Sequence, residues 1–194
     1  MKTKRMLIIL AVLLFVYAIS CKKIDNQDSL PTNTEVGANT FSFRVQGKEY
    51  ESHVSWSFPR ISVAYNHIDT FFHNNYLFEI EGNRVYAEDN KHVIIGIHFM
   101  PKVGVYKLSK YEWLGKGDYA TYEDDNPSSL YYGTDSIHTG ELTITKLDTI
   151  NFIISGRFNF KAIESCVYRI CNSVITIDGQ FDVTYKPNNN INYY

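Results

Sequence analysis

The chain has 194 residues, a formal charge of −2 and three cysteines. Removal of the N-terminal signal described below takes three of the 19 basic residues and none of the 21 acidic ones, which leaves a formal side-chain charge of −5. This negative balance argues against a nucleic-acid partner. About 150 further residues are enough for a single domain with its own core.

The N-terminus is typical of a secretory signal. Lys2, Lys4 and Arg5 precede an apolar run that ends at Ala18-Ile19-Ser20-Cys21. A span from Met6 to Ser20 is shorter than the ~20 residues that cross a bilayer. The segment resembles the bacterial lipobox, in which the cysteine is diacylated and becomes the new N-terminus. An ordinary signal peptide with an incidental cysteine is the alternative, because Ala18 stands where leucine is commoner.

We therefore expect residues 1–20 to be a signal peptide, Cys21 to be lipidated and the protein to be anchored in a membrane. Lys22 follows the lipidated position where many inner-membrane lipoproteins have aspartate, so the outer membrane is favoured; the periplasmic face and the cell surface both remain open. Residues 21–39 are polar and predict a flexible tether with a reach of roughly 25 Å. A single β domain is expected over 40–187, with a polar tail at 188–194.

The closing part of the domain carries two strand patterns of period two, over Phe152–Ala162 and Ile175–Tyr185. A hairpin register that places Cys166 opposite Cys171 keeps both apolar faces on one side. It pairs Phe160 with Ile177, Ile154 with Val183 and Phe152 with Tyr185, and sets Gly156 and Gly179 beneath the rings of Phe181 and Phe158. Opposed residues have Cα separations that suit a disulfide. The Cys166–Cys171 pair is expected to be bonded, with free thiols or a metal site as alternatives.

The remaining patterns also predict strands. Leu142–Thr145 joins the closing hairpin through a turn at Leu147–Thr149, which makes a three-stranded meander. Phe41–Val45 is followed by the turn Gln46–Glu49, for which Gly47 predicts type II′. Further strands are expected at Ile61–Asn66, Tyr76–Glu81, Asn83–Ala87, His92–Phe99 and Val105–Leu108, with turns at Glu81-Gly82-Asn83 and elsewhere. Without helical periodicity, the expected fold is all-β, an antiparallel β-sandwich with meander hairpins; the alternative is a partly open β-barrel.

Three segments together, the lipobox, the opening FSFRVQGKEY and the closing SGRFNF and ITIDGQFDV, resemble a family of small Bacteroidetes-type lipoproteins of unknown function. The resemblance covers roughly Thr40–Tyr185. It implies the β fold and no particular activity. The matching positions are Gly47, Lys48, Tyr50, Gly156, Phe158, Phe160, Asp178, Gly179, Phe181 and Asp182.

The sequence contains no clear catalytic signature, so no catalytic residue, cofactor or metal ligand is predicted. Gly115–Ala120 fits a dinucleotide-binding pattern, but no helix is expected after it. His67, Asp69 and His73 would suit metal ligands if they converged, although scattered histidines in β proteins are more often surface or half-buried residues.

Aromatic residues are concentrated between Tyr111 and Tyr132, in a stretch rich in Gly, Asp, Ser and Lys that predicts a long loop or a ragged hairpin. Such a surface suits a glycan or protein partner. The alternative is that the rings close an open end of the core. The favoured function is a non-enzymatic binding or accessory module for a glycan or envelope protein; a hydrolase or metal-dependent enzyme and a purely structural lipoprotein are the alternatives. The candidate ligand-binding residues are Tyr111, Trp113, Tyr119, Tyr122, Tyr131 and Tyr132.

Overall fold

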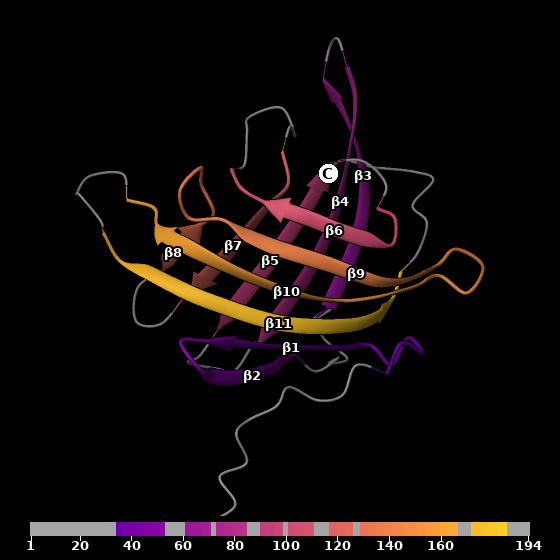
Figure 1. Ribbon diagram of the computed structural model, residues 1–194, viewed down its shortest axis with the longest axis horizontal. Helices are drawn as coiled ribbons and strands as arrows, with labels where there is room; N and C mark the ends of the chain where they lie inside the picture. The colour runs from indigo at the N-terminus through magenta and orange to yellow at the C-terminus, as the bar shows by residue number, and fades with distance from the viewer. Residues whose placement is uncertain are drawn as a thin grey trace, which may run out of the picture.

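The computed structural model describes residues 34–52, 61–70, 73–84, 90–98, 101–110, 117–125, 129–166 and 172–185, with the backbone alone at 61–70 and 73–77. Within these ranges every regular element is a strand (Figure 1), and no helix is long and apolar enough to cross a membrane. The strands are β1 (Thr40–Val45), β2 (Lys48–Ser52), β3 (Ile61–Thr70), β4 (His73–Arg84), β5 (Lys91–His98), β6 (Gly104–Leu108), β7 (Tyr119–Asp124), β8 (Leu130–Gly133), β9 (Gly140–Asp148), β10 (Ile153–Glu164) and β11 (Val174–Thr184).

All strand pairs are antiparallel, and they form one hydrogen-bonded sheet in the order β2-β1-β11-β10-β8-β7-β5-β4-β3. β10 has two partners on its other edge: β9 along Ile153–Phe160 and β8 at Ile163 and Glu164. β6 pairs with the free side of β9. The layer that contains β9, β10 and β11 therefore crosses in front of the layer that contains β4, β5 and β7 (Figure 1).

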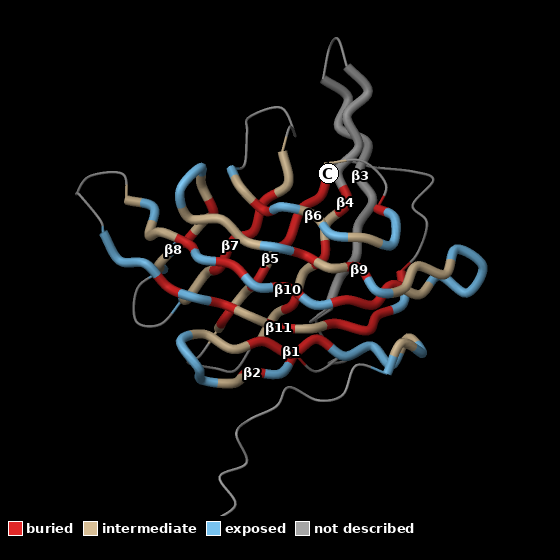
Figure 2. Tube along the Cα trace, in the orientation of Figure 1, coloured by how far each residue is buried: buried red, intermediate tan, exposed pale blue. Residues whose placement is uncertain are grey.

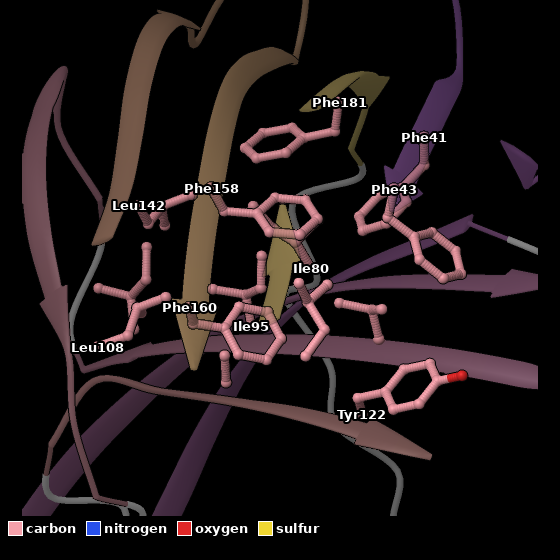
Figure 3. Close-up of a cluster of buried hydrophobic side chains, with 14 of the residues drawn as sticks. Phe41, Phe43, Ile80, Ile95, Leu108, Tyr122, Leu142, Phe158, Phe160 and Phe181 are labelled. Carbon is pink, nitrogen blue, oxygen red and sulfur yellow. The ribbon is translucent and has the colours of Figure 1, made fainter. Parts of the chain in front are cut away.

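This arrangement is all-β and nearly closed, so the fold is the partly open barrel. It corrects the preference for a two-sheet sandwich, because β10 connects both layers through backbone hydrogen bonds. The buried and exposed positions alternate along the strands (Figure 2). Phenylalanines from β1, β10 and β11 meet isoleucines of β4 and β5 between the layers (Figure 3). Burial of these side chains supplies the main driving force for folding.

The register predicted for the closing hairpin is confirmed. β10 and β11 pair Phe160 with Ile177 and Ile154 with Val183. The two strand glycines lie where cross-strand rings approach the backbone. A Cβ atom on Gly179 would lie 2.4 Å from Cζ of Phe158, so only glycine leaves room for that ring.

The meander is also confirmed, but its turn lies later than expected. β9 continues to Asp148, and residues 149–152 connect it to β10. The Asp148 carboxylate accepts hydrogen bonds from the backbone N–H groups of Ile150 and Asn151, at 3.0 and 2.9 Å. This Asx turn determines where the strand ends. A β-bulge between Ser155 and Gly156 adjusts the register along the rest of the pair.

The opening hairpin exists, but its turn type was predicted wrongly. Val45 pairs with Lys48, so the loop consists of Gln46 and Gly47. Their φ angles are +54° and +83°. Positive φ at both loop positions defines a type I′ turn rather than the expected type II′ turn.

The turn predicted at Glu81-Gly82-Asn83 is wrong, because these residues lie inside the continuous strand β4. Gly82 leaves space for a ring. A Cβ atom there would lie 2.2 Å from Cδ1 of Phe41 in β1. The glycine therefore permits close packing between the two layers.

Candidate ligand-binding site

A pocket of about 390 Å³ lies over β7, β8 and the C-terminal end of β10. It is formed on the outward faces of these strands, where β10 leaves β9 and joins β8. The residues that line it are Lys110, Tyr119, Ala120, Thr121, Tyr131, Gly133, Thr134, Asp135, Ile163, Glu164 and Ser165.

Strand alternation determines which side chains reach this pocket. Ala120 and Tyr122 of β7 belong to the hydrophobic core, so Tyr119 and Thr121 face the opposite way. Thr121 pairs with Gly133 across the β7–β8 hairpin. The absence of a side chain at Gly133 and the small side chain at Thr121 leave space between the two neighbouring tyrosines.

Tyr119 is held in a fixed orientation. Its hydroxyl donates a hydrogen bond to Oε1 of Glu79 at 2.5 Å. Its ring lies over Gly96 of β5, where a Cβ atom would be 2.3 Å from Cε1. The glycine thus lets the ring lie against the strand, and the hydrogen bond prevents it from rotating away. Tyr119 is only 6% exposed, so it forms a wall of the pocket with little free ring surface, whereas Tyr131 is 44% exposed.

Hydrogen bonds attach the pocket residue Thr134, which follows β8, to β7. The N–H of Ala120 donates to Oγ1 of Thr134 at 3.0 Å, and the N–H of Thr134 donates to the carbonyl of Ala120 at 2.9 Å. On the other side, the N–H of Ser165 donates to the carbonyl of Tyr131 at 2.7 Å. These bonds fix the pocket's walls before any ligand arrives, which lowers the entropic cost of binding.

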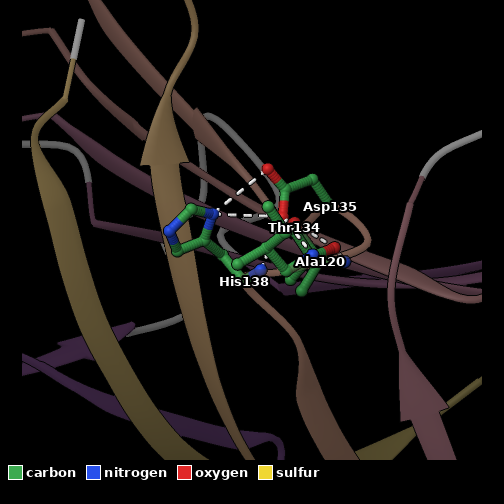
Figure 4. Close-up of polar contacts among 5 residues, drawn as sticks. Ala120, Thr134, Asp135 and His138 are labelled. Carbon is green, nitrogen blue, oxygen red and sulfur yellow. Dashed lines mark hydrogen bonds and ion pairs between the residues drawn. The ribbon is translucent and has the colours of Figure 1, made fainter.

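Asp135 supplies an ionised carboxylate at the pocket (Figure 4). Its Oδ1 accepts hydrogen bonds from the N–H groups of Ile137 and His138, at 2.7 and 2.5 Å. Nδ1 of His138 lies 3.1 Å from both carboxylate oxygens. The bond from the His138 backbone is the main cause that lowers the pKa of Asp135, with the His138 side chain adding to it.

The six predicted aromatic residues have different environments. Tyr119 and Tyr131 line the pocket. Tyr122 and Tyr132 are buried in the core with ring centroids 6.0 Å apart, which corrects the expectation that they share an exposed surface and agrees with the core-closing alternative. Tyr111 and Trp113 lie outside the described residues. Within the described part of the stretch, β7 and β8 pair as an antiparallel hairpin, close to the ragged hairpin that was expected.

The predicted disulfide stays a prediction, because Cys171 lies outside the described residues. The ladder approaching it follows the expected register: Ile163 pairs with Val174, and the N–H of Glu164 donates to the carbonyl of Ser173 at 2.9 Å. The side chains of His67, Asp69 and His73 are likewise outside the described part of the chain. Among the side chains that the structure does describe, no cluster of three or more His, Cys, Asp or Glu residues is arranged to hold a metal ion.

Asp118 precedes the pocket tyrosine. Burial raises its pKa, while the hydrogen bond from the backbone N–H of His98 acts in the opposite direction. That bond is 2.7 Å long and ties the start of β7 to the end of β5. The carboxylate therefore has a clear role in positioning Tyr119.

A second polar centre, which the sequence reasoning missed, lies at the other end of β10. Asp182 of β11 is fully buried beneath residues 34–39, here called the strap. Its carboxylate accepts bonds from the Thr34 hydroxyl at 2.6 Å, from the N–H groups of Val36, Gly37 and Ala38 at 3.0, 2.8 and 3.1 Å, and from the Ser155 hydroxyl at 2.8 Å.

The strap adopts a conformation suited to this carboxylate. Glu35, Gly37 and Asn39 all have positive φ, at +53°, +77° and +55°. Left-handed residues at alternate positions turn successive N–H groups toward one side, which makes an anion-binding nest. Burial alone would raise the pKa of Asp182, but the bonds from Thr34, Ala38, Ser155 and Gly37 lower it to about 2.

These observations define the class of protein: a small all-β, partly open barrel with a preformed pocket on its outer face. Residues 66–193 match the family model described as "Domain of unknown function (DUF6252)", and the chain belongs to that family. No curated protein and no solved structure matches it. The wider resemblance to Bacteroidetes-type lipoproteins stays a prediction.

Proposed function

We propose that this protein is a lipid-anchored envelope protein of the outer membrane that binds a glycan in the pocket between Tyr119 and Tyr131. The arrangement of two tyrosines on either side of the small pair Thr121 and Gly133 carries the proposal. Aromatic rings offer flat apolar area together with a polar group. A sugar presents the matching combination of C–H faces and hydroxyl groups.

The polar lining supports the same ligand class. Lys110, Asp135 and Glu164 place charged groups at a pocket whose floor is formed by strand residues. Binding sites typically combine such a largely fixed surface with a few polar groups that orient the ligand. The ionised Asp135 suits acceptance of hydrogen bonds from sugar hydroxyl groups.

The hydrolase alternative requires two carboxylates at one pocket, and Asp135 and Glu164 both line this one. A glycosidase needs one of them protonated as a general acid. The bonds from His138 lower the pKa of Asp135 and disfavour that role for it. The binding assay should therefore include analysis of the glycans for cleavage; hydrolysis would support the enzyme over the binding module.

The test is a glycan array probed with the purified protein, followed by titration of the best-bound glycan. Tyr131→Ala should weaken binding by about fivefold or more, as loss of an interface anchor does. Trp113→Ala should be titrated as a second variant. Trp113 is one of the predicted ligand-binding residues, and it follows the pocket residue Lys110 by three positions in the chain. Val105→Ala removes an exposed apolar side chain from β6 and should leave affinity unchanged. Equal affinity of Tyr131→Ala and the unmodified protein would contradict the proposal.

A further inference from the structure

Exposed apolar side chains gather where the strap joins the barrel. Val36 of the strap is 67% exposed, and Ile150 and Phe152 of the β9–β10 turn are 85% and 38% exposed. We call these three residues the rim patch. Figure 2 shows both segments as exposed on the same side of the barrel, opposite β8.

Direct contacts hold the two segments of the rim patch together. Nζ of Lys146 in β9 donates to the carbonyl of Glu35 at 2.7 Å. Gly37 leaves room for Ile153, whose Cγ1 would be 3.0 Å from a Cβ atom there. Val36 directly precedes Gly37 and Phe152 directly precedes Ile153. The contact between Gly37 and Ile153 therefore brings the backbone at Val36 close to the backbone at Phe152.

The β9–β10 turn presents its apolar residues on a fixed backbone. Asp148 accepts bonds from Ile150 and Asn151, and the backbone bond from Asn151 is the main cause that lowers the pKa of this carboxyl group. Phe152 has a φ of +54° and packs edge-on against Tyr185, with ring centroids 5.7 Å apart. Turns usually carry Gly, Pro, Asn, Asp or Ser. A fixed turn with isoleucine at its tip instead suggests a partner that is itself apolar.

We infer that the rim patch docks on the lipid bilayer. This inference rests on the lipid anchor of the proposed function. Asp182 fixes the strap from Thr34 onward, so only residues 22–33 separate Cys21 from the barrel. A flexible segment of that length has a reach of roughly 20 Å. The rim patch is therefore the end of the domain that the anchor holds closest to lipid.

The charges around the patch indicate which lipids it needs. Among the described residues, Glu35, Lys146 and Asp148 surround it, and these give it no basic excess that would select anionic headgroups. The contact is apolar insertion, and a neutral phosphatidylcholine bilayer is sufficient. The ligand pocket begins at Ile163, about eleven residues beyond Phe152, or roughly 35 Å at strand spacing. Docking of the rim patch turns that pocket away from the membrane.

The orientation is measurable with a fluorophore on either end of the barrel. The chain starting at Cys21 is coupled through its N-terminal cysteine to a cyanobenzothiazole lipid, a reagent that does not react with internal cysteines. Thr149, beside the rim patch, or Ser136, beside the pocket, is replaced by p-azidophenylalanine and labelled with a polarity-sensitive dye. Each protein is then inserted into phosphatidylcholine vesicles that contain doxyl-labelled lipid.

The dye at Thr149 should be quenched at least about twofold more strongly than the dye at Ser136, because only the former approaches the acyl chains. Ile150→Ser combined with Val36→Ser should reduce that quenching by about half or more, while Ile137→Ser, an equally exposed change at the pocket end, should not. Equal quenching at both ends, or no effect of the double variant, would overturn the inference. Since the anchor is attached chemically, this result is independent of whether cells acylate Cys21.

Discussion

Asp182 determines where the N-terminal segment becomes part of the fold. The period-two pattern places it on the outward face of β11, and all of its hydrogen-bond partners except Ser155 lie nearly 150 residues earlier in the chain. No local pattern reveals that the strap will cover it. The consequence is that residues 34–39, the described part of the segment expected as a tether, are held against the barrel by hydrogen bonds.

We expect Asp182→Asn to lower the free energy of unfolding at pH 7 by about 2 kcal/mol. A fall of the pKa from 3.8 to about 2 corresponds to about that amount of stabilisation of the ionised form. Because the folded pKa is depressed, this stabilisation is fully present above pH ~4 and is lost as the pH falls toward 2. Urea unfolding at pH 7 and pH 3 should therefore show a smaller difference between variant and unmodified protein at the lower pH.

Asp178→Asn is the matched control. Asp178 lies on the same strand as Asp182 and forms an ion pair with Arg44 of the neighbouring strand β1, but its side chain is a third exposed. Solvent-exposed ion pairs contribute less than about 1 kcal/mol. An equal loss for both variants, or a loss at Asp182 that does not change with pH, would show that the nest does not depend on the carboxylate charge.

The glycines show which residue-level predictions are accessible from sequence. Gly156 and Gly179 lie under rings of the adjacent strand of their own hairpin, so the register was enough to place them. Gly82 packs under Phe41, which is distant in sequence and belongs to the other layer. Without knowledge of that layer, a turn was the reasonable interpretation of Gly82.

Among the strand pairs, the β10–β11 hairpin was the easiest to predict because its two alternating patterns fit only one register well. β7 and β8 were harder. Their residues face the core on one side and a pocket of mixed polarity on the other, so the alternation is weak. The pocket forms where β10 stops pairing with β9 and begins to pair with β8. This change of partner along one strand has no sequence signature.

The disulfide prediction belongs to the same hairpin. A disulfide that closes so short a loop contributes about 2 kcal/mol in the chain-entropy model. Reduction should lower the melting temperature by roughly 4 to 8 °C for a domain of this size without unfolding it. The double variant Cys166→Ser, Cys171→Ser should melt at the reduced protein's temperature and should not respond to reductant. Alkylation of both cysteines in unreduced protein, detected by mass spectrometry, would refute the pairing.

At the scale of the whole molecule, sequence patterns predicted the all-β class. Of the two expected architectures they favoured the sandwich, whereas the observed one is the alternative, the partly open barrel. Short alternating strands fit a sandwich and a barrel equally well. The choice depends on which strands become neighbours across long separations. Here β10 pairs with both layers, and that single junction makes the sheet continuous.

Anchoring is also a property of the complete chain. Cys21→Ala should abolish acylation, and the protein should then leave the membrane fraction, because the apolar rim patch alone is too small to hold it there. Cell fractionation followed by a high-salt wash measures this directly, with Cys166→Ala as a control that keeps Cys21. Retention of the Cys21→Ala protein in the washed membranes would argue against the lipobox.

The position of the last strand has a consequence for how the molecule is assembled during synthesis. β11 lies between β1 and β10, so the first hairpin of the domain has no neighbour in the sheet until the C-terminal residues have been made. The strap depends on β11 as well, since its carboxylate partner is Asp182. An emerging chain therefore cannot complete this barrel from its N-terminus onward, because the sheet closes around the first hairpin only after β11 has been made.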